Sequence, residues 1–175
     1  MKPRRAIARV VAALLPALAA APVGAQLGPN QATTGWPGVE VGARVGFDNS
    51  QRQEVAGALL RIPVLRSGRV ELLPNADVTF LRGLKEYQVN AEAVYVSGGR
   101  EGGLYAGGGI GSRSTILPSD PAAGRQRIRT YSLVLGAKLS SLGRVHPLLE
   151  FRRVFASRLA VDPQQITLGV TISIW

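Results

Sequence analysis

Residues 87–95 read YQVNAEAVY, and apolar and polar side chains alternate from Tyr87 to Ala93. One phase consists of tyrosine, valine and alanine, and the other consists of Gln88, Asn90 and Glu92. A period of two is typical of a β-strand, because successive side chains of a strand point to opposite faces of its sheet. This strand is therefore predicted to separate an apolar environment from a polar one.

Seven further stretches show the same period, so the chain is predicted to be all-β. The additional strands are predicted at residues 39–47, 55–64, 70–80, 104–111, 130–139, 144–152 and 166–174. Short connections with the sequences RSGR, SGGREGG and SSLG alternate with longer or more polar ones, which are DNSQRQ, RGLKE, the proline-rich residues 112–127 and ASRLAVDPQ. Eight antiparallel strands with alternating short and long connections form an up-and-down β-barrel.

The two faces of the predicted strands differ in charge. The apolar phase carries aliphatic, small and aromatic residues, and a charge on a lipid-facing position costs about 2 to 4 kcal/mol at the middle of a bilayer. This face is therefore predicted to contact lipid, so the barrel is transmembrane. A soluble lipocalin-like barrel would have the two faces reversed. The inward phase is predicted to hold an ion network of five acids and four bases: Glu40, Arg44, Arg61, Glu71, Asp77, Glu92, Lys138, Glu150 and Arg152.

The ten aromatic residues are predicted to lie at the ends of strands, where outer-membrane barrels carry aromatic girdles. The outer ends are predicted to hold Phe47, Phe80, Tyr87, Tyr131, Phe151 and Phe155. The periplasmic ends are predicted to hold Trp36, Tyr95, Tyr105 and Trp175.

Residues 1–25 are predicted to be a secretory signal peptide, and residues 26–175 are predicted to form the single barrel domain. The apolar run at 10–21 contains Pro16 and is shorter than the roughly 20 residues that a membrane-spanning helix needs. Small residues follow it up to Ala25, as at a cleavage site. The predicted location is the bacterial outer membrane, after export. The positively charged start consists of Lys2, Arg4, Arg5 and Arg9.

The formal net charge is +10, and the signal peptide contributes four of the 21 basic residues. The remaining basic residues fall in predicted loops or singly along strands, whereas a nucleic-acid protein would gather them on one helix or patch. We therefore expect no nucleic-acid partner. The chain contains no cysteine, so disulfides and thiolate metal sites are excluded, and neither a metal nor a cofactor is expected.

The final residues, ITLGVTISIW, look like the C-terminal signal that the barrel-assembly machinery reads. With the signal peptide and the rhythm of strands and loops, they make the chain resemble the small eight-stranded outer-membrane barrels typified by the OmpA transmembrane domain and OmpX. This resemblance implies an integral outer-membrane protein that meets the assembly machinery during insertion. One departure is that Trp175 is out of phase with Ile174 and Ile172, whereas the terminal aromatic residue of that family usually shares the outward phase.

The resemblance also raises the question of catalysis. Some barrels of this type are lipid A deacylases with a Ser, His and acid triad in which the serine follows the histidine by two residues. The single histidine is His146, and that position is Leu148. Glu150 lies four residues from His146, or about 13 Å along a strand. We therefore propose no catalytic residue from the sequence.

An eight-stranded barrel is only wide enough to be filled by its own side chains, so the ion network is expected to plug the lumen and allow little or no conduction. The predicted function is structural or interactive, with contacts to outer-membrane lipid and lipopolysaccharide, because guanidinium groups match phosphate geometry. The alternatives are a narrow pore, a lipid A-modifying enzyme and a soluble periplasmic carrier. The lipopolysaccharide contacts are predicted in external loops, at Arg82, Lys85, Arg113, Arg125, Arg127, Arg153 and Arg158.

Overall fold

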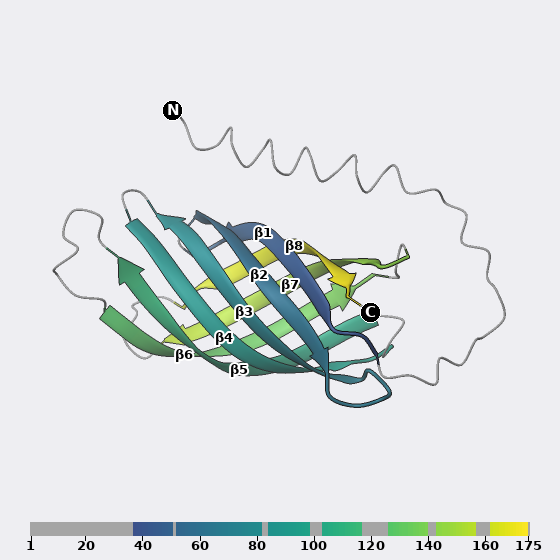
Figure 1. Ribbon diagram of the computed structural model, residues 1–175. Coiled ribbons are helices and arrows are strands. Elements are labelled where there is room, and N and C mark those ends of the chain that lie inside the picture. Colours follow the sequence, from purple (N-terminus) through teal and green to yellow (C-terminus); the bar gives the residue numbers. More distant parts are fainter. Residues whose placement is uncertain are drawn as a thin grey trace. The chain divides into compact units, whose positions relative to one another are not determined.

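Eight β-strands make up the regular structure of the residues that the computed structural model describes (Figure 1). The structure describes residues 37–50, 52–81, 84–98, 103–116, 126–139, 143–156 and 162–174. The strands are β1 (Glu40–Asp48), β2 (Gln53–Pro63), β3 (Val70–Leu81), β4 (Leu84–Val96), β5 (Gly103–Ile116), β6 (Gln126–Lys138), β7 (Val145–Ala156) and β8 (Gln164–Ser173). Within those ranges no helix has the length and apolarity needed to cross a bilayer.

The strands close into a barrel in which each is antiparallel to its two neighbours. Strands β1 and β8, at opposite ends of the chain, lie side by side in Figure 1 and pair from Glu40 with Ser173 to Asp48 with Gln165. Closure leaves no sheet edge, so every strand has a hydrogen-bonded neighbour on both sides. The predicted all-β, eight-stranded antiparallel up-and-down barrel is confirmed.

Several strands are longer than the alternation of hydropathy predicts. Strand β5 runs for 14 residues to Ile116, well past its predicted end at residue 111. The pairing of β3 with β4 continues to Leu81 and Leu84, so Lys85 belongs to a strand and not to a loop. Alternation of hydropathy reveals a strand only where one of its faces is apolar. Backbone pairing also continues through positions at which both faces are polar, so a strand can extend beyond its alternating part.

The exposure of side chains follows the predicted phases. Outward residues such as Leu104 and Ile110 are 66% and 65% exposed, whereas inward Arg44 and Glu92 are 2% and 1% exposed. Monomeric soluble proteins rarely present contiguous apolar surface on this scale to water. The outer wall of the barrel is therefore an apolar surface, and its interior holds the ionic residues.

The sequence predicts Tyr105 at a membrane boundary, and this prediction is wrong. Tyr105 lies inside the barrel with 1% of its surface exposed. It belongs to the inward phase of β5, and Gly136 on β6 leaves the space that its ring occupies. Its hydroxyl donates a hydrogen bond to Glu150 Oε2 at 3.0 Å, and the Arg61 guanidinium lies 4.6 Å from its ring centroid. An aromatic residue with a polar tip suits such a mixed environment.

The other predicted boundary aromatics are distributed as follows. Trp36 and Trp175 fall outside the described residues. Phe155 is half-buried. The structure places the following on the outer surface: Phe47, Phe80, Tyr87, Tyr95, Tyr131 and Phe151.

The interior also contains an apolar cluster, which the predicted ionic lumen does not include. The cluster lies toward the end of the barrel that carries the short connections. Since aliphatic side chains there cannot hydrogen bond to water, they exclude it from that end of the lumen. The cluster consists of Leu73, Val94, Val96, Tyr105 and Val134.

We predict that Gly136→Ala destabilises the barrel by about 1 to 3 kcal/mol, the usual cost of overpacking. A Cβ atom at this position would overlap the ring of Tyr105. The loss is measured as a shift in urea unfolding in detergent micelles, monitored by Trp fluorescence and by gel mobility.

Ala137→Val is the matched control, because it adds carbon atoms at the neighbouring, partly exposed position. In the Tyr105→Ala background the Gly136→Ala substitution should cost much less, since the clashing ring is gone. An equal cost in both backgrounds would show that the Tyr105 ring is not the obstacle.

Candidate functional site

Arg44, on β1, lies at the centre of the ionic interior. Its Nε and Nη2 atoms donate to the two carboxylate oxygens of Asp77 on β3, at 3.0 and 2.7 Å. Its Nη1 atom donates to Glu150 Oε1 on β7 at 2.6 Å. A two-pronged guanidinium–carboxylate contact fixes orientation as well as charge, so Arg44 ties three strands together from the inside.

Arg152, on β7, also forms ion pairs with Asp77 and Glu150, and with a third acid, Glu92. Its Nη1 atom lies 3.0 Å from Asp77 Oδ2, and its Nη2 atom lies 2.7 Å from Glu92 Oε2 and 2.8 Å from Glu150 Oε1. We call this five-residue group the central network; its members are Arg44, Asp77, Glu92, Glu150 and Arg152.

The central network contains three carboxylates and two guanidiniums, so neutral donors complete the bonding of the acids. Ser132 donates its hydroxyl to Glu92 Oε1 at 2.7 Å, and Asn75 donates its amide to Glu92 Oε2 at 2.9 Å. The Tyr105 hydroxyl serves Glu150 in the same way. Buried charges are tolerated when ion pairs and hydrogen bonds together satisfy them.

Two further ion pairs lie toward the short connections. Arg61 Nε donates to Glu71 Oε2 at 2.7 Å. Lys138 Nζ donates to Glu40, which also accepts a hydrogen bond from the Thr171 hydroxyl at 2.6 Å. The structure thus places all nine residues of the sequence-based ion network in the interior, each with an oppositely charged partner.

The predicted lipopolysaccharide contact at Arg113 is wrong. The sequence places it in an external loop, but it lies on β5 with 2% of its surface exposed and pairs with Glu86 of β4. Its register explains this, because Arg113 shares the inward phase of Tyr105 once β5 is extended beyond Gly111. Beyond Gly111 both faces of β5 carry polar residues, so alternation of hydropathy gave no signal for this pair.

Side chains pack around the central network. Each of its five residues is 2% exposed or less, so the described structure has no open channel past them. A water-filled channel through this level would leave its lining exposed. The described interior is therefore closed at the level of the central network.

His146 lies near the start of β7, in contact with a serine that sequence spacing did not reveal. Its Nε2 atom is 3.1 Å from Ser173 Oγ of β8 and 3.7 Å from Glu40 Oε1, while its Nδ1 atom has no hydrogen-bond partner. In a catalytic triad the acid orients the imidazole through the nitrogen opposite the one that serves the hydroxyl. Here both groups approach the same nitrogen, and Glu40 is already engaged by Lys138 and Thr171.

Of the other six basic residues predicted to contact lipopolysaccharide, three lie on the outward face and three fall outside the described residues. Lys85, Arg127 and Arg153 are exposed on β4, β6 and β7, near the ends that carry the longer connections. Arg153 lies 3.4 Å from Asp162 and covers the ring of Phe155. The three outside the described residues are Arg82, Arg125 and Arg158. Among the residues that the structure describes, no group of three acidic or histidine side chains is arranged to hold a metal ion.

The sequence matches no protein-family model and no curated protein, whereas solved structures match it well. The N-terminal β-barrel domain of Pseudomonas aeruginosa OprF aligns over 79% of this chain and 98% of its own, with a TM-score of 0.62 and 18% identity. The chain has the fold of the small outer-membrane barrels. Neisserial surface protein A aligns over 78% of this chain and 94% of its own, with a TM-score of 0.58 and 10% identity.

The same fold occurs in an enzyme. The outer-membrane enzyme PagL aligns over 77% of this chain and 99% of its own, with a TM-score of 0.52 and 15% identity. Because a fold does not specify an activity, function must be argued from the side chains of this barrel.

We predict that Arg44→Met destabilises the barrel by about 3 to 5 kcal/mol, because it leaves buried carboxylates without their cation. The measurement is the free energy of unfolding in urea, in detergent micelles. Arg153→Met is the matched control, since its ion pair is 47% exposed on the arginine side and exposed pairs contribute about 0 to 1 kcal/mol. Equal losses in the two variants would contradict a stabilising role for the central network.

Proposed function

We propose that this chain is an integral outer-membrane protein of structural or interaction type, with a lumen closed by its own side chains. Residues 1–25 serve as a signal peptide, and residues 26–175 insert as the barrel with help from the barrel-assembly machinery. The observation that carries the proposal is the uncharged band on the outer wall.

This band is continuous from strand to strand. On β4, every outward residue between Tyr87 and Tyr95 is valine or alanine, and on β6 leucine and alanine follow Tyr131. Along the eight described strands, charged outward side chains occur only within four residues of the ends that carry the longer connections; they are Glu54, Lys85, Arg127, Arg129 and Arg153. A bilayer imposes this distribution, because charge is tolerated at its boundaries and costly at its middle.

The closed lumen supports a structural role over a pore. Conduction requires a continuous polar path, and the central network occupies that path with ion pairs between β1, β3, β4 and β7. On the outside, the basic residues near the longer connections would face lipopolysaccharide phosphates. The contact with lipopolysaccharide is therefore part of the proposal.

We predict that the protein, folded into vesicles, resists extraction by alkaline carbonate and migrates differently on gels with and without boiling. Both results follow from a closed barrel with an apolar outer wall. Folded protein that stays in solution without detergent would instead support the soluble carrier and overturn the proposal.

The same preparation tests the lumen. In planar bilayers the folded protein should give no large, steady conductance, because the central network admits no column of water. A stable open level in most insertions would support the narrow pore. The boiled sample, which contains unfolded chain, controls for leakage caused by the detergent.

A lipid A-modifying enzyme is the second candidate, and the contact between His146 and Ser173 is the observation that favours it. We propose that this pair is not catalytic, because Glu40 does not orient the imidazole. We predict that lipid A incubated with the folded protein keeps its mass, as judged by mass spectrometry. A mass loss that disappears in Ser173→Ala would establish the enzyme.

A further inference from the structure

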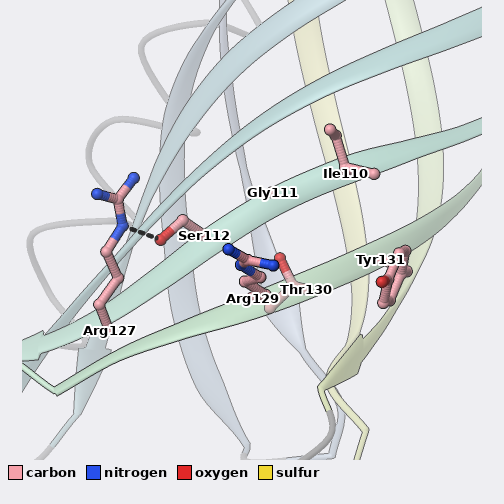
Figure 2. A pocket seen from close by; sticks show the side chains of 7 residues that line it. All are labelled: Ile110, Gly111, Ser112, Arg127, Arg129, Thr130 and Tyr131. Atoms are coloured by element: carbon pink, nitrogen blue, oxygen red, sulfur yellow. Dashed lines mark hydrogen bonds between the residues drawn. The ribbon is translucent and has the colours of Figure 1, made fainter.

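A hollow on the outer wall lies over β5 and β6, near the ends that carry the longer connections. Its lining is Ile110, Gly111, Ser112, Arg127, Arg129, Thr130 and Tyr131. Figure 2 shows the two arginines toward one end of this surface, with Ile110 and Tyr131 toward the other. The hollow therefore has a cationic part and an apolar part.

The cationic part has no acid to neutralise it within the described residues. Arg127 Nε donates to Ser112 Oγ at 2.7 Å (Figure 2), which orients the guanidinium and leaves its terminal nitrogens available. Arg129 lies directly opposite Ser112 in the strand register. The acid of the adjoining strand, Glu86, is engaged by Arg113. Lys85 adds a further outward positive charge on β4.

The hollow lies at the height where a lipid headgroup is expected. Tyr131 belongs to the exposed aromatic residues that mark a membrane boundary. Arg129 and Arg127 lie two and four residues beyond it on the same face, or about 5 and 9 Å farther from the membrane centre for a tilted strand. Ile110 and Tyr131 are 65% and 62% exposed, so acyl chains can contact them directly.

We propose that this hollow is a binding site for the phosphate group of a phosphorylated glycolipid of the outer leaflet, that is, the lipid A part of lipopolysaccharide. The inference rests on the proposed function, which supplies the membrane and the outward end. The proposal assigns the lipopolysaccharide contact to one site instead of to several loops. In this site Arg127 and Arg129 bind the phosphate through charge-assisted hydrogen bonds, and Ser112 positions Arg127.

Charge and shape together select this ligand. Arg127 and Arg129 lie two positions apart on one strand face, so their Cα atoms are about 7 Å apart and their long side chains can both reach the oxygens of one phosphate. Free phosphate would gain nothing from Ile110 and Tyr131, whereas a lipid-linked phosphate gains from both parts of the hollow. The longer connections of outer-membrane barrels are extracellular, so the lipid at this end is lipopolysaccharide.

The experiment compares Arg127→Gln/Arg129→Gln with Arg69→Gln/Arg144→Gln, which removes the same charge from exposed turns at the opposite end. Binding of fluorescent lipopolysaccharide to the folded barrel in neutral micelles is measured by polarisation. The first pair should weaken binding by about tenfold or more, and the second by less than about twofold. Ser112→Ala should weaken lipopolysaccharide binding, but by less than the double arginine variant does. Ser114→Ala, at the next outward position of β5, should leave binding unchanged.

Three further probes identify the ligand. Lipopolysaccharide treated with phosphatase should bind the wild type and the Arg127→Gln/Arg129→Gln variant equally weakly. Phosphatidylglycerol that binds as tightly as lipopolysaccharide, or inorganic phosphate that displaces it at millimolar concentration, would overturn the assignment to a glycolipid. Equal losses of lipopolysaccharide binding in both double variants would show that only the net charge of the protein matters, and this result would overturn the proposed site.

Failure of this inference can be separated from failure of the proposed function. A barrel that shows the mobility shift and resists carbonate, but binds lipopolysaccharide equally well with and without Arg127 and Arg129, contradicts only the site. A chain that is folded in solution without detergent contradicts the membrane location itself.

Discussion

Charge that has left water must be matched within the protein, and this constraint organises the barrel around Arg44 and Arg152. Their two guanidiniums share the carboxylates of Asp77 and Glu150. The ion pairs of one arginine therefore depend on the position of the other. The ionic residues find their partners only inside the barrel, because the apolar outer wall offers none. The inward placement of charge and the apolar outer wall are therefore two results of the same alternation along each strand.

The interior is graded along the barrel axis. Toward the short connections, Leu73, Val94 and Val96 exclude water beside the Arg61–Glu71 and Lys138–Glu40 pairs. The central network follows, and the Arg113–Glu86 pair lies nearer the longer connections. An interior filled in this way links strands that are distant in the sequence through their side chains.

Alternation alone predicted the strand number, the antiparallel order and which face of each strand turns inward. It could not predict the ends of β5 and β6, because polar residues on both faces beyond Gly111 hide the period, and Arg113 was misplaced for that reason. Nor could it predict partners: the pairing of Arg44 with Asp77 and Glu150 depends on register and barrel stagger. Tyr105 was expected at a membrane boundary although its phase on β5 is inward, and the room for its ring comes from Gly136 on the adjacent strand.

The central network also bears on the order of assembly. Arg44 and Glu150 are 106 positions apart in the chain, and β7 contributes both Glu150 and Arg152. Arg44 can pair with Asp77 before β7 is in place, whereas Glu92 meets its cation, Arg152, only when β7 joins, and contacts of long sequence separation form slowly. The central network is complete only in the closed barrel, so its full contribution to stability is gained together with the pairing of the last two strands.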